Sequence, residues 1–280
     1  MVNFVEPNVE LVGETVGFPP IGLMNVDVPS EPAEDLIEFA GRNCYQSFDK
    51  PNEKTRKNKD YIQNIIKQKH FSVLEHASAS FYITGVSRAF THELIRHRHL
   101  SFSQLSQRYV DESDLNLVLP PLLRDFLEEH GNQEAVQAFA YSMEAAYAEE
   151  YQATVTLLSE KTDASRKQVR EAARAFLPNM TETRIVVTGN FRAWREFLEK
   201  RLSPAADAEM QEVARLILDA LMYIAPSVFE DIHTELYKDD EEVEEPSSSS
   251  IGQEPEPLNE LLNVWEEFLS QITSEEKSSS

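Results

Sequence analysis

The spacing of apolar residues along the chain predicts more helix than strand. A half-alternating segment at 77–84, closed by Gly85, predicts one strand, and the short segment RIVVT at 184–188 predicts another. Residues 89–96 predict a short helix with Phe90, Leu94 and Ile95 on one side. Longer helices are predicted over residues 33–43, 61–68, 122–130, 133–159, 164–177, 190–202 and 207–225. Together these elements predict a body of mixed α/β (α+β) class.

Three residues are expected to fix helix boundaries. Asp163 is a good N-cap for the helix over 164–177, which Pro178 should end. Asn190 is expected to open the helix over 190–202, directly after a predicted strand. The helix over 207–225 is predicted to be the last one of the folded body.

The composition changes after residue 237. Residues 238–280 hold thirteen acidic side chains against two lysines, together with three prolines and the serine run 247–250. Such a segment cannot bury enough apolar surface to fold alone. We therefore expect a folded body over 1–237 and a largely disordered acidic tail, with a short helix over 258–272 as the alternative. The tail's partner is not identified by its sequence.

Charge and cysteine content narrow the functional classes. The 280 residues carry a formal net charge of −23 and are 41% hydrophobic, which suits a globular protein that binds neither nucleic acid nor a membrane surface. A single cysteine, Cys44, rules out an internal disulfide framework. The first residues lack a basic region followed by an apolar run, and no apolar stretch approaches about 20 residues. These features predict a cytoplasmic protein.

One segment of this acidic chain is locally basic; it is called the basic segment below. Between residues 88 and 110 lie four arginines and three histidines, opposed only by Glu93. Arginine forks match phosphate oxygens in pairs, so the segment predicts an anion site. Because the eight glycines form neither G-x-G-x-x-G nor G-x-x-x-x-G-K, a nucleotide would be held by side chains. The alternatives are a solvated basic loop and a metal site at His92, His97 and His99; without a nearby cysteine, no metal is expected.

Four further residues are candidates for a catalytic or binding role. Cys44 has no histidine base nearby, so we expect a buried, inert thiol. Ser106 likewise lacks a base and is expected to donate a hydrogen bond to a phosphate or ribose. Arg174 has apolar neighbours that favour a buried anion contact, whereas Arg170 is expected to pair on the helix surface with Glu171 or Asp163.

Three sequence blocks carry a recognisable pattern. The first is R-H-R at 96–98 with Ser106 eight residues after Arg98, continued by QLSQRY at 104–109; the others are KHFSVLEHASASFYI at 69–83 and ARAFLPNMTETRIVVTGNFRAWREFLEKR at 173–201. Together these blocks resemble the flavin-dependent thymidylate synthases. The resemblance covers about residues 5–235. It implies a helix-rich fold with a central antiparallel sheet and a homotetramer whose active sites are shared between subunits. It also implies that FAD, reduced by NADPH, supplies a hydride, and that methylenetetrahydrofolate supplies the carbon that converts dUMP to dTMP in thymidylate biosynthesis.

The same resemblance implies residue roles. FAD would contact Ser72, Arg96, His97, Arg98, Gln104, Asn190, Phe191, Arg192 and Glu196. The dUMP site would be lined by Glu93, Leu94, Ile95, Arg96, Gln104, Leu105, Ser106, Gln107 and Arg108.

Two arginines and one histidine have more particular roles by the same resemblance. Arg174 would reach the dUMP of an adjacent subunit, and His70 would lie near the nicotinamide or folate. Arg201 would face the uracil, and a guanidinium beside N3 activates C5 without a cysteine nucleophile. Two positions depart from the family: Glu196 replaces an asparagine or histidine beside the flavin, and Ala205 replaces a frequent histidine.

Other functional classes remain open at this point. The basic segment could bind single-stranded nucleic acid with Phe102 and Tyr109 stacking on bases, which the net charge disfavours. Residues 258–272 could tether the chain to a partner. A lapsed enzyme that keeps nucleotide binding is disfavoured by the intact R-H-R motif, Ser106, Arg174 and Arg201.

Overall fold

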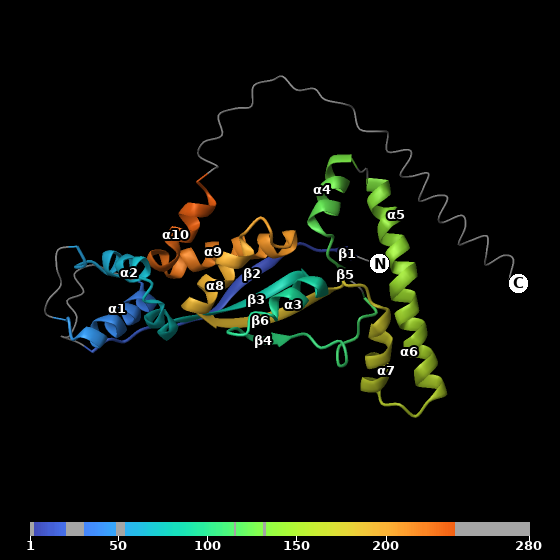
Figure 1. Ribbon diagram of the computed structural model, residues 1–280. Coiled ribbons are helices and arrows are strands. Elements are labelled where there is room, and N and C mark those ends of the chain that lie inside the picture. The colour runs from blue at the N-terminus through green and yellow to red at the C-terminus, as the bar shows by residue number, and fades with distance from the viewer. Residues whose placement is uncertain (1–2, 21–30, 49–53, 115, 131–132, 239–280) are drawn as a thin grey trace, which may run out of the picture.

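The computed structural model describes the chain except residues 1–2, 21–30, 49–53, 115, 131–132 and 239–280 (Figure 1). The predicted acidic tail and its alternative helix over 258–272 therefore lie outside the described residues. The helices are α1 (Pro32–Tyr45), α2 (Asn58–Lys67), α3 (Arg88–Leu94), α4 (Pro121–His130), α5 (Gln133–Met143), α6 (Glu150–Lys161), α7 (Arg166–Ala173), α8 (Phe191–Arg201), α9 (Ala208–Ile224) and α10 (Pro226–Leu236). The shorter turns are the 3-10 helices Phe71–His76 and Arg174–Phe176 and the π-helix Glu144–Glu149.

A four-stranded antiparallel sheet forms the centre of the fold. Its strands are β2 (Asn8–Glu14), β3 (Ser78–Ser87), β6 (Glu182–Asn190) and β4 (Ser101–Gln104), in the spatial order β2-β3-β6-β4. A separate two-stranded parallel pair joins β1 (Asn3–Phe4) to β5 (Asn116–Leu117). The antiparallel central sheet and the excess of helix confirm the predicted fold class.

Helices cover one face of this sheet. Phe81 and Ile83 of β3 are fully buried, and their paired residues Val187 and Ile185 of β6 are buried beside them. Helices α8 and α9 pack on this face, where the Trp194 indole Nε1 donates to a β3 carbonyl at 3.1 Å (Figure 1). The alternate residues of β3 and β6 line the opposite face, which is less buried in the single chain.

The structure corrects the predicted end of the first strand. Strand β3 does not stop at Gly85 but continues to Ser87, with a shift of register between Ile83 and Val86. Gly85 adopts φ 64°, and an added Cβ would collide with the Glu6 carbonyl. Glycine therefore bends this strand through a bulge instead of ending it, since only glycine readily adopts this backbone conformation.

Helix boundaries also differ from those predicted. Ser165, not Asp163, caps α7 through a capping box with Gln168. The predicted helix over 133–159 is interrupted by the π-helix between α5 and α6. The helix over 207–225 is not the last one, because Pro226 begins α10. Asn190 caps α8 as predicted, with its side chain accepting from the Ala193 N–H.

Candidate active site

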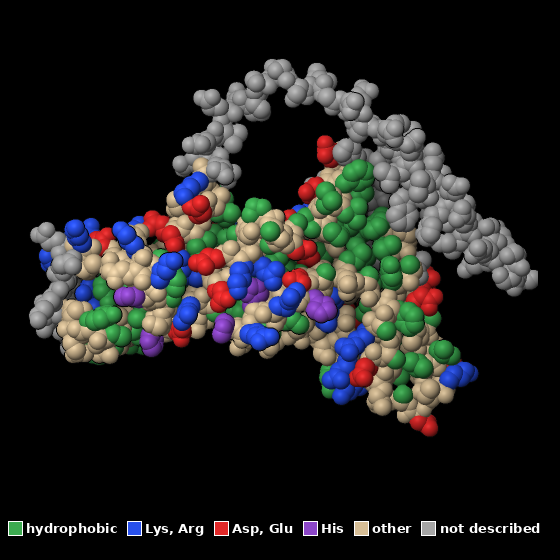
Figure 2. Space-filling view, viewed as in Figure 1, with side chains coloured by type: hydrophobic (Ala, Val, Ile, Leu, Met, Phe, Trp, Pro, Cys, Tyr) green, Lys and Arg blue, Asp and Glu red, His purple; other side chains and the backbone are tan. Residues whose placement is uncertain are grey.

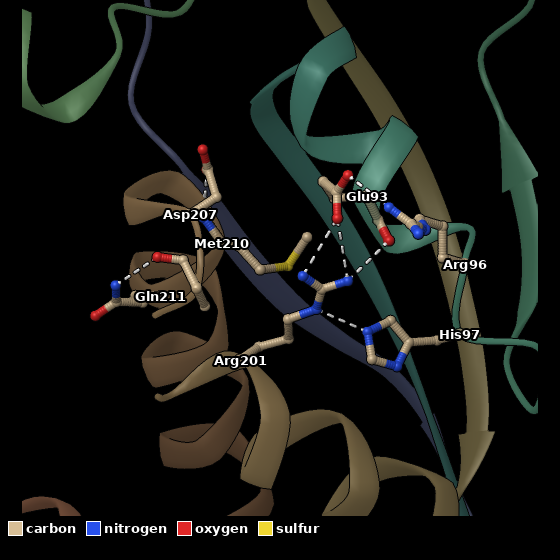
Figure 3. A network of polar contacts seen from close by, with 8 residues as sticks. Glu93, Arg96, His97, Arg201, Asp207, Met210 and Gln211 are labelled. Atoms are coloured by element: carbon tan, nitrogen blue, oxygen red, sulfur yellow. Dashed lines mark hydrogen bonds and ion pairs between the residues drawn. The ribbon is translucent and has the colours of Figure 1, made fainter. Parts of the chain in front are cut away.

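Arg201, at the end of α8, is held by two neighbours from the basic segment. Its Nε donates to Nε2 of His97 at 2.8 Å, and its Nη2 donates to the Glu93 carbonyl at 3.2 Å. The Glu93 carboxylate lies 3.4 Å from Nη1 and also accepts from Arg96 at 3.3 Å (Figure 3). The basic segment thus fixes the guanidinium of a residue far away in sequence, and the Arg201 side chain is only 16% exposed.

The protonation states of this network follow from its surroundings. Burial, and then the charges of Arg201 and Lys200, lower the pKa of His97 to about 4, so its ring is neutral at pH 7. Since Nε2 accepts from Arg201, the ring proton lies on Nδ1. Burial raises the pKa of Glu93, but the hydrogen bonds and charges of Arg96 and Arg201 outweigh it and leave that pKa lowered. Glu93 is therefore an anion beside two arginines.

These residues border a cavity of about 470 Å³, here called the Arg201 cavity. Its only acids among the described lining residues are Glu93 and Glu196, and Glu196 accepts from Lys200 at 2.6 Å. The lining residues are Glu93, Arg96, His97, Arg98, His99, Leu100, Ala193, Glu196, Lys200 and Arg201. Figure 2 shows Lys, Arg and His side chains gathered over this part of the molecule, where α3 and β4 lie. The cavity suits an anionic ligand.

A second cavity, the Arg174 cavity, has a volume of about 510 Å³. Arg88 and Arg174 line it, and neither forms an ion pair with a carboxylate in the part of the chain that the structure describes. Burial, and then the charge of Arg174, lower the pKa of Arg88. The polar lining includes Gln104 and Gln107, and Gln104 donates to the Thr91 hydroxyl at 2.9 Å. Two unmatched guanidiniums beside amide groups are suited to a phosphate.

A third cavity, the Ser72 cavity, has a volume of about 370 Å³ and lies at the N-terminal end of α8. Ser72, His70 and Arg192 line it, and Arg192 forms an ion pair with Glu75 at 2.6 Å. Cys44 also lines this cavity and is exposed, so the prediction of a buried thiol was wrong. The cysteine lies near the end of α1, on its less buried side.

The predicted FAD contacts are divided among these places. Arg96, His97, Arg98 and Glu196 share the Arg201 cavity, whereas Ser72 and Arg192 share the Ser72 cavity and Gln104 lines the Arg174 cavity. The Phe191 side chain lies in none of them, because it is fully buried against Phe229. Asn190 uses its side chain to cap α8.

The predicted dUMP contacts are likewise divided. Leu94 is fully buried, and the Ser106 carbonyl accepts from the N–H groups of residues 109 and 110. Gln107 lines the Arg174 cavity, and Arg108 pairs with Glu171 at 3.1 Å. Ile95 is exposed and also lines the Arg174 cavity. Leu105 is half-buried, and its N–H donates to the Arg184 carbonyl.

The surroundings of Arg170, on α7, and of Arg174, directly after α7, differ from those predicted. Arg174 is exposed at the Arg174 cavity rather than buried, since it follows the last turn of α7. Arg170 does not pair with Glu171 or Asp163; its guanidinium binds the Asp111 carboxylate and the Tyr109 carbonyl, both at 2.5 Å. Asp111 is 59 residues distant in sequence, so helical spacing could not indicate this partner.

Lys200 and Arg88 were missed by the sequence analysis as site residues. Lys200 stands next to Arg201, and its spacing of four from Glu196 could have indicated their ion pair. The three histidines of the basic segment are split, because His92 lines the Arg174 cavity while His97 and His99 line the Arg201 cavity. Within the described residues, no group of three potential ligands could hold a metal ion.

Residues 28–227 match the family described as "Thymidylate synthase complementing protein". A flavin-dependent thymidylate synthase of Mycobacterium avium is 49% identical over 246 residues, which cover 87% of this chain and 96% of that protein. The chain belongs to this family. It is therefore an enzyme, a flavin-dependent thymidylate synthase, and the resemblance based on the R-H-R block is confirmed. A second relative, from Mycobacterium tuberculosis, is 50% identical over 228 residues, covering 80% of this chain and 89% of its own length.

Solved structures share the fold of the enzyme. A UMP/dUMP methylase PolB from Streptomyces cacaoi, bound with 5-Br dUMP, has a TM-score of 0.59 at 21% identity and covers 85% of this chain and 97% of its own. Thymidylate synthase X from Helicobacter pylori, with FAD and dUMP, has a TM-score of 0.54 at 24% identity, with coverages of 81% and 99%. No helix among the described residues has the length and apolarity needed to cross a bilayer.

One buried acid near Arg88 gives the enzyme a testable pH dependence. Burial raises the pKa of Glu112 to about 7, and its Oε1 has no hydrogen-bond partner. The pKa of Glu112 is higher in the folded than in the unfolded protein. Its contribution to the free energy of unfolding is therefore fully present below pH 4.5 and is lost as the pH rises through 7. Between pH 5 and 8, the wild type should therefore lose about 1–3 kcal/mol more of its free energy of unfolding than Glu112→Gln does.

Urea unfolding at both pH values measures this difference. Glu150→Gln, at an exposed position, is the matched control and should behave as the wild type does. If Glu112→Gln and the wild type lose the same stability over this range, the assigned protonation of Glu112 is wrong.

Proposed function

We propose that the enzyme methylates dUMP to dTMP, with methylenetetrahydrofolate as carbon donor and NADPH-reduced FAD as hydride source. The observation that carries this proposal is the fixed guanidinium of Arg201 at the wall of a cation-rich cavity. The names of the relatives and of the solved structures support the flavin and the pyrimidine nucleotide. The folate and NADPH rest on the family resemblance of the sequence blocks.

The donor chemistry of the chain fits FAD. Arg96 and Arg98 in the Arg201 cavity offer guanidiniums for a pyrophosphate, and His97 presents a neutral ring. Ser72 and Arg192 would hold another part of the cofactor at the opposite end of α8. Bound there, FAD supplies the hydride that the methylation requires.

Arg201 activates the pyrimidine. When the N3 proton of uracil leaves, an adjacent guanidinium stabilises the resulting anion, and C5 becomes nucleophilic toward the methylene carbon of the folate. His97 and Glu93 keep this guanidinium in place, so it needs little reorganisation when the negative charge develops. Cys44 lies in the Ser72 cavity, and no attack by an enzyme cysteine is needed.

The active site is completed by neighbouring subunits of a homotetramer. The residues assigned to FAD and dUMP are distributed over three cavities of one chain, which suits sites assembled from several chains. The less buried face of the sheet, with Val186 exposed at its centre, is available to another subunit. Arg174 reaches the dUMP of an adjacent subunit, His70 lies near the nicotinamide or folate, and the enzyme works in the cytoplasm.

The visible absorbance spectrum of the purified protein tests this proposal. A flavin band is expected, either as purified or after incubation with FAD, and anaerobic NADPH should bleach it faster or more completely when dUMP is present. Formation of dTMP on adding methylenetetrahydrofolate completes the assay. A protein that stays colourless after incubation with FAD contradicts the proposed function.

A further inference from the structure

Glu171 is the single acid among the described residues that line the Arg174 cavity. It lies on α7, three residues before Arg174, and its Oε2 accepts from Nη1 of Arg108 at 3.1 Å. Arg88 and Arg174 line this cavity and form no ion pair with a carboxylate in the described part of the chain, whereas Arg108 is not one of the lining residues and reaches the cavity wall only through Glu171. The acid in the wall of the Arg174 cavity is therefore already paired with a neighbouring arginine before any ligand binds.

The Arg108–Glu171 pair is exposed enough to exchange partners. The side chain of Arg108 is 38% exposed and that of Glu171 is 47% exposed. Ion pairs with this exposure add little to stability, because water solvates both charges well. By contrast, the α7 arginine one residue earlier, Arg170, is 14% exposed and bound to both Asp111 and a carbonyl. The helix is thus anchored by Arg170, while Arg108 is free to turn to another anion.

We propose that the Glu171 carboxylate pairs with Arg108 in the empty site and is displaced from it by the phosphate of the nucleotide. Glu171 thereby sets the affinity of the site for substrate and product. This inference rests on the proposed function, which supplies dUMP as the ligand. A phosphate monoester near pH 7 carries nearly two charges and three acceptor oxygens, so it competes well with one carboxylate for a guanidinium. The displaced Glu171 stays close and repels the phosphate.

This competition has a consequence for turnover. The reaction leaves the phosphate of dUMP unchanged, so dTMP is held by the same arginines. A carboxylate that returns to Arg108 helps the product to leave, because the freed guanidinium regains a partner. Removal of the Glu171 charge should therefore tighten the binding of substrate and product alike.

Glu171→Gln tests the proposal in the full-length, FAD-loaded enzyme. The dissociation constants of dUMP and dTMP are expected to fall about 3- to 10-fold, and that of deoxyuridine, which lacks the phosphate, should not change. The tightening should shrink as the KCl concentration rises. Glu171→Asp keeps the charge and should stay within about twofold of the wild type. Glu150→Gln removes a charge from an exposed position on α6 and should have no effect.

Two results would overturn this inference. In the first, Glu171→Gln leaves dUMP binding unchanged or weakens it, which would mean that Glu171 orients Arg108 for the phosphate instead of competing with it. In the second, deoxyuridine binds tighter to the same extent as dUMP. Both presuppose a wild-type enzyme that binds dUMP; a wild type that binds neither FAD nor dUMP refutes the proposed function itself.

Discussion

Replacing Arg201 by alanine is expected to stop dTMP formation while FAD remains bound. The guanidinium is held at 2.8 Å from His97 and 3.2 Å from the Glu93 carbonyl, which aims a permanent charge at one wall of the Arg201 cavity. Removal of a preorganised charge that meets the developing anion typically costs about 10²–10³-fold in rate, and we expect a loss at least that large. Product analysis by chromatography measures it, and the flavin absorbance reports the retained cofactor.

Two further variants separate charge from position. Arg201→Lys keeps a charge but loses the planar fork that binds His97 and Glu93 together, so its activity should lie between those of the wild type and Arg201→Ala. Cys44→Ala should turn over normally, because Cys44 is not among the residues that line the Arg201 cavity, where the uracil is expected to react. An active Arg201→Ala enzyme would refute the role of Arg201, and an inactive Cys44→Ala enzyme would bring back a covalent mechanism.

Elements with strong local signals were predicted well, and those without them were missed. Helices α1, α8 and α9 have an apolar side that sequence alone displays, and α8 and α9 also begin after capping side chains, those of Asn190 and Asp207. Strand β4 reads SFSQ, with a single apolar residue, and is formed only because it pairs with β6. The capping box at Ser165 and Gln168 was visible in the sequence, so Asp163 was a wrong choice between two good caps.

The site was predictable in its residues but not in its arrangement. The charge reversal of the basic segment indicated an anion site, and Arg96, His97 and Arg201 do meet at one cavity. The separation of His92 from His97 depends on the turn after α3, which directs them to different cavities. The partner of Arg170 depends on packing between α7 and a distant loop, which no local pattern encodes.

The second large effect is expected from mixing an impaired variant with an inactive one. Arg174→Ala should lower kcat/KM about 10- to 100-fold, the cost of losing a charged hydrogen bond to the substrate, and Arg201→Ala should be inactive. If Arg174 serves the site of a neighbouring subunit, a mixed tetramer contains sites with both arginines intact. Coexpression of the two variants in equal amounts should then restore about a quarter of the wild-type activity.

The matched control pairs Arg201→Ala with Arg96→Ala. Both residues line the Arg201 cavity of the same chain, so mixed tetramers of these two variants contain no site in which both arginines of that cavity are intact. Purification through two different affinity tags ensures that only mixed tetramers are assayed. Because each chain supplies its own Arg201 cavity, restored activity in the first mixture and none in the second can arise only if Arg174 crosses a subunit boundary. If neither mixture regains activity, Arg174 and Arg201 serve one site from the same chain, and the shared-site assembly is wrong.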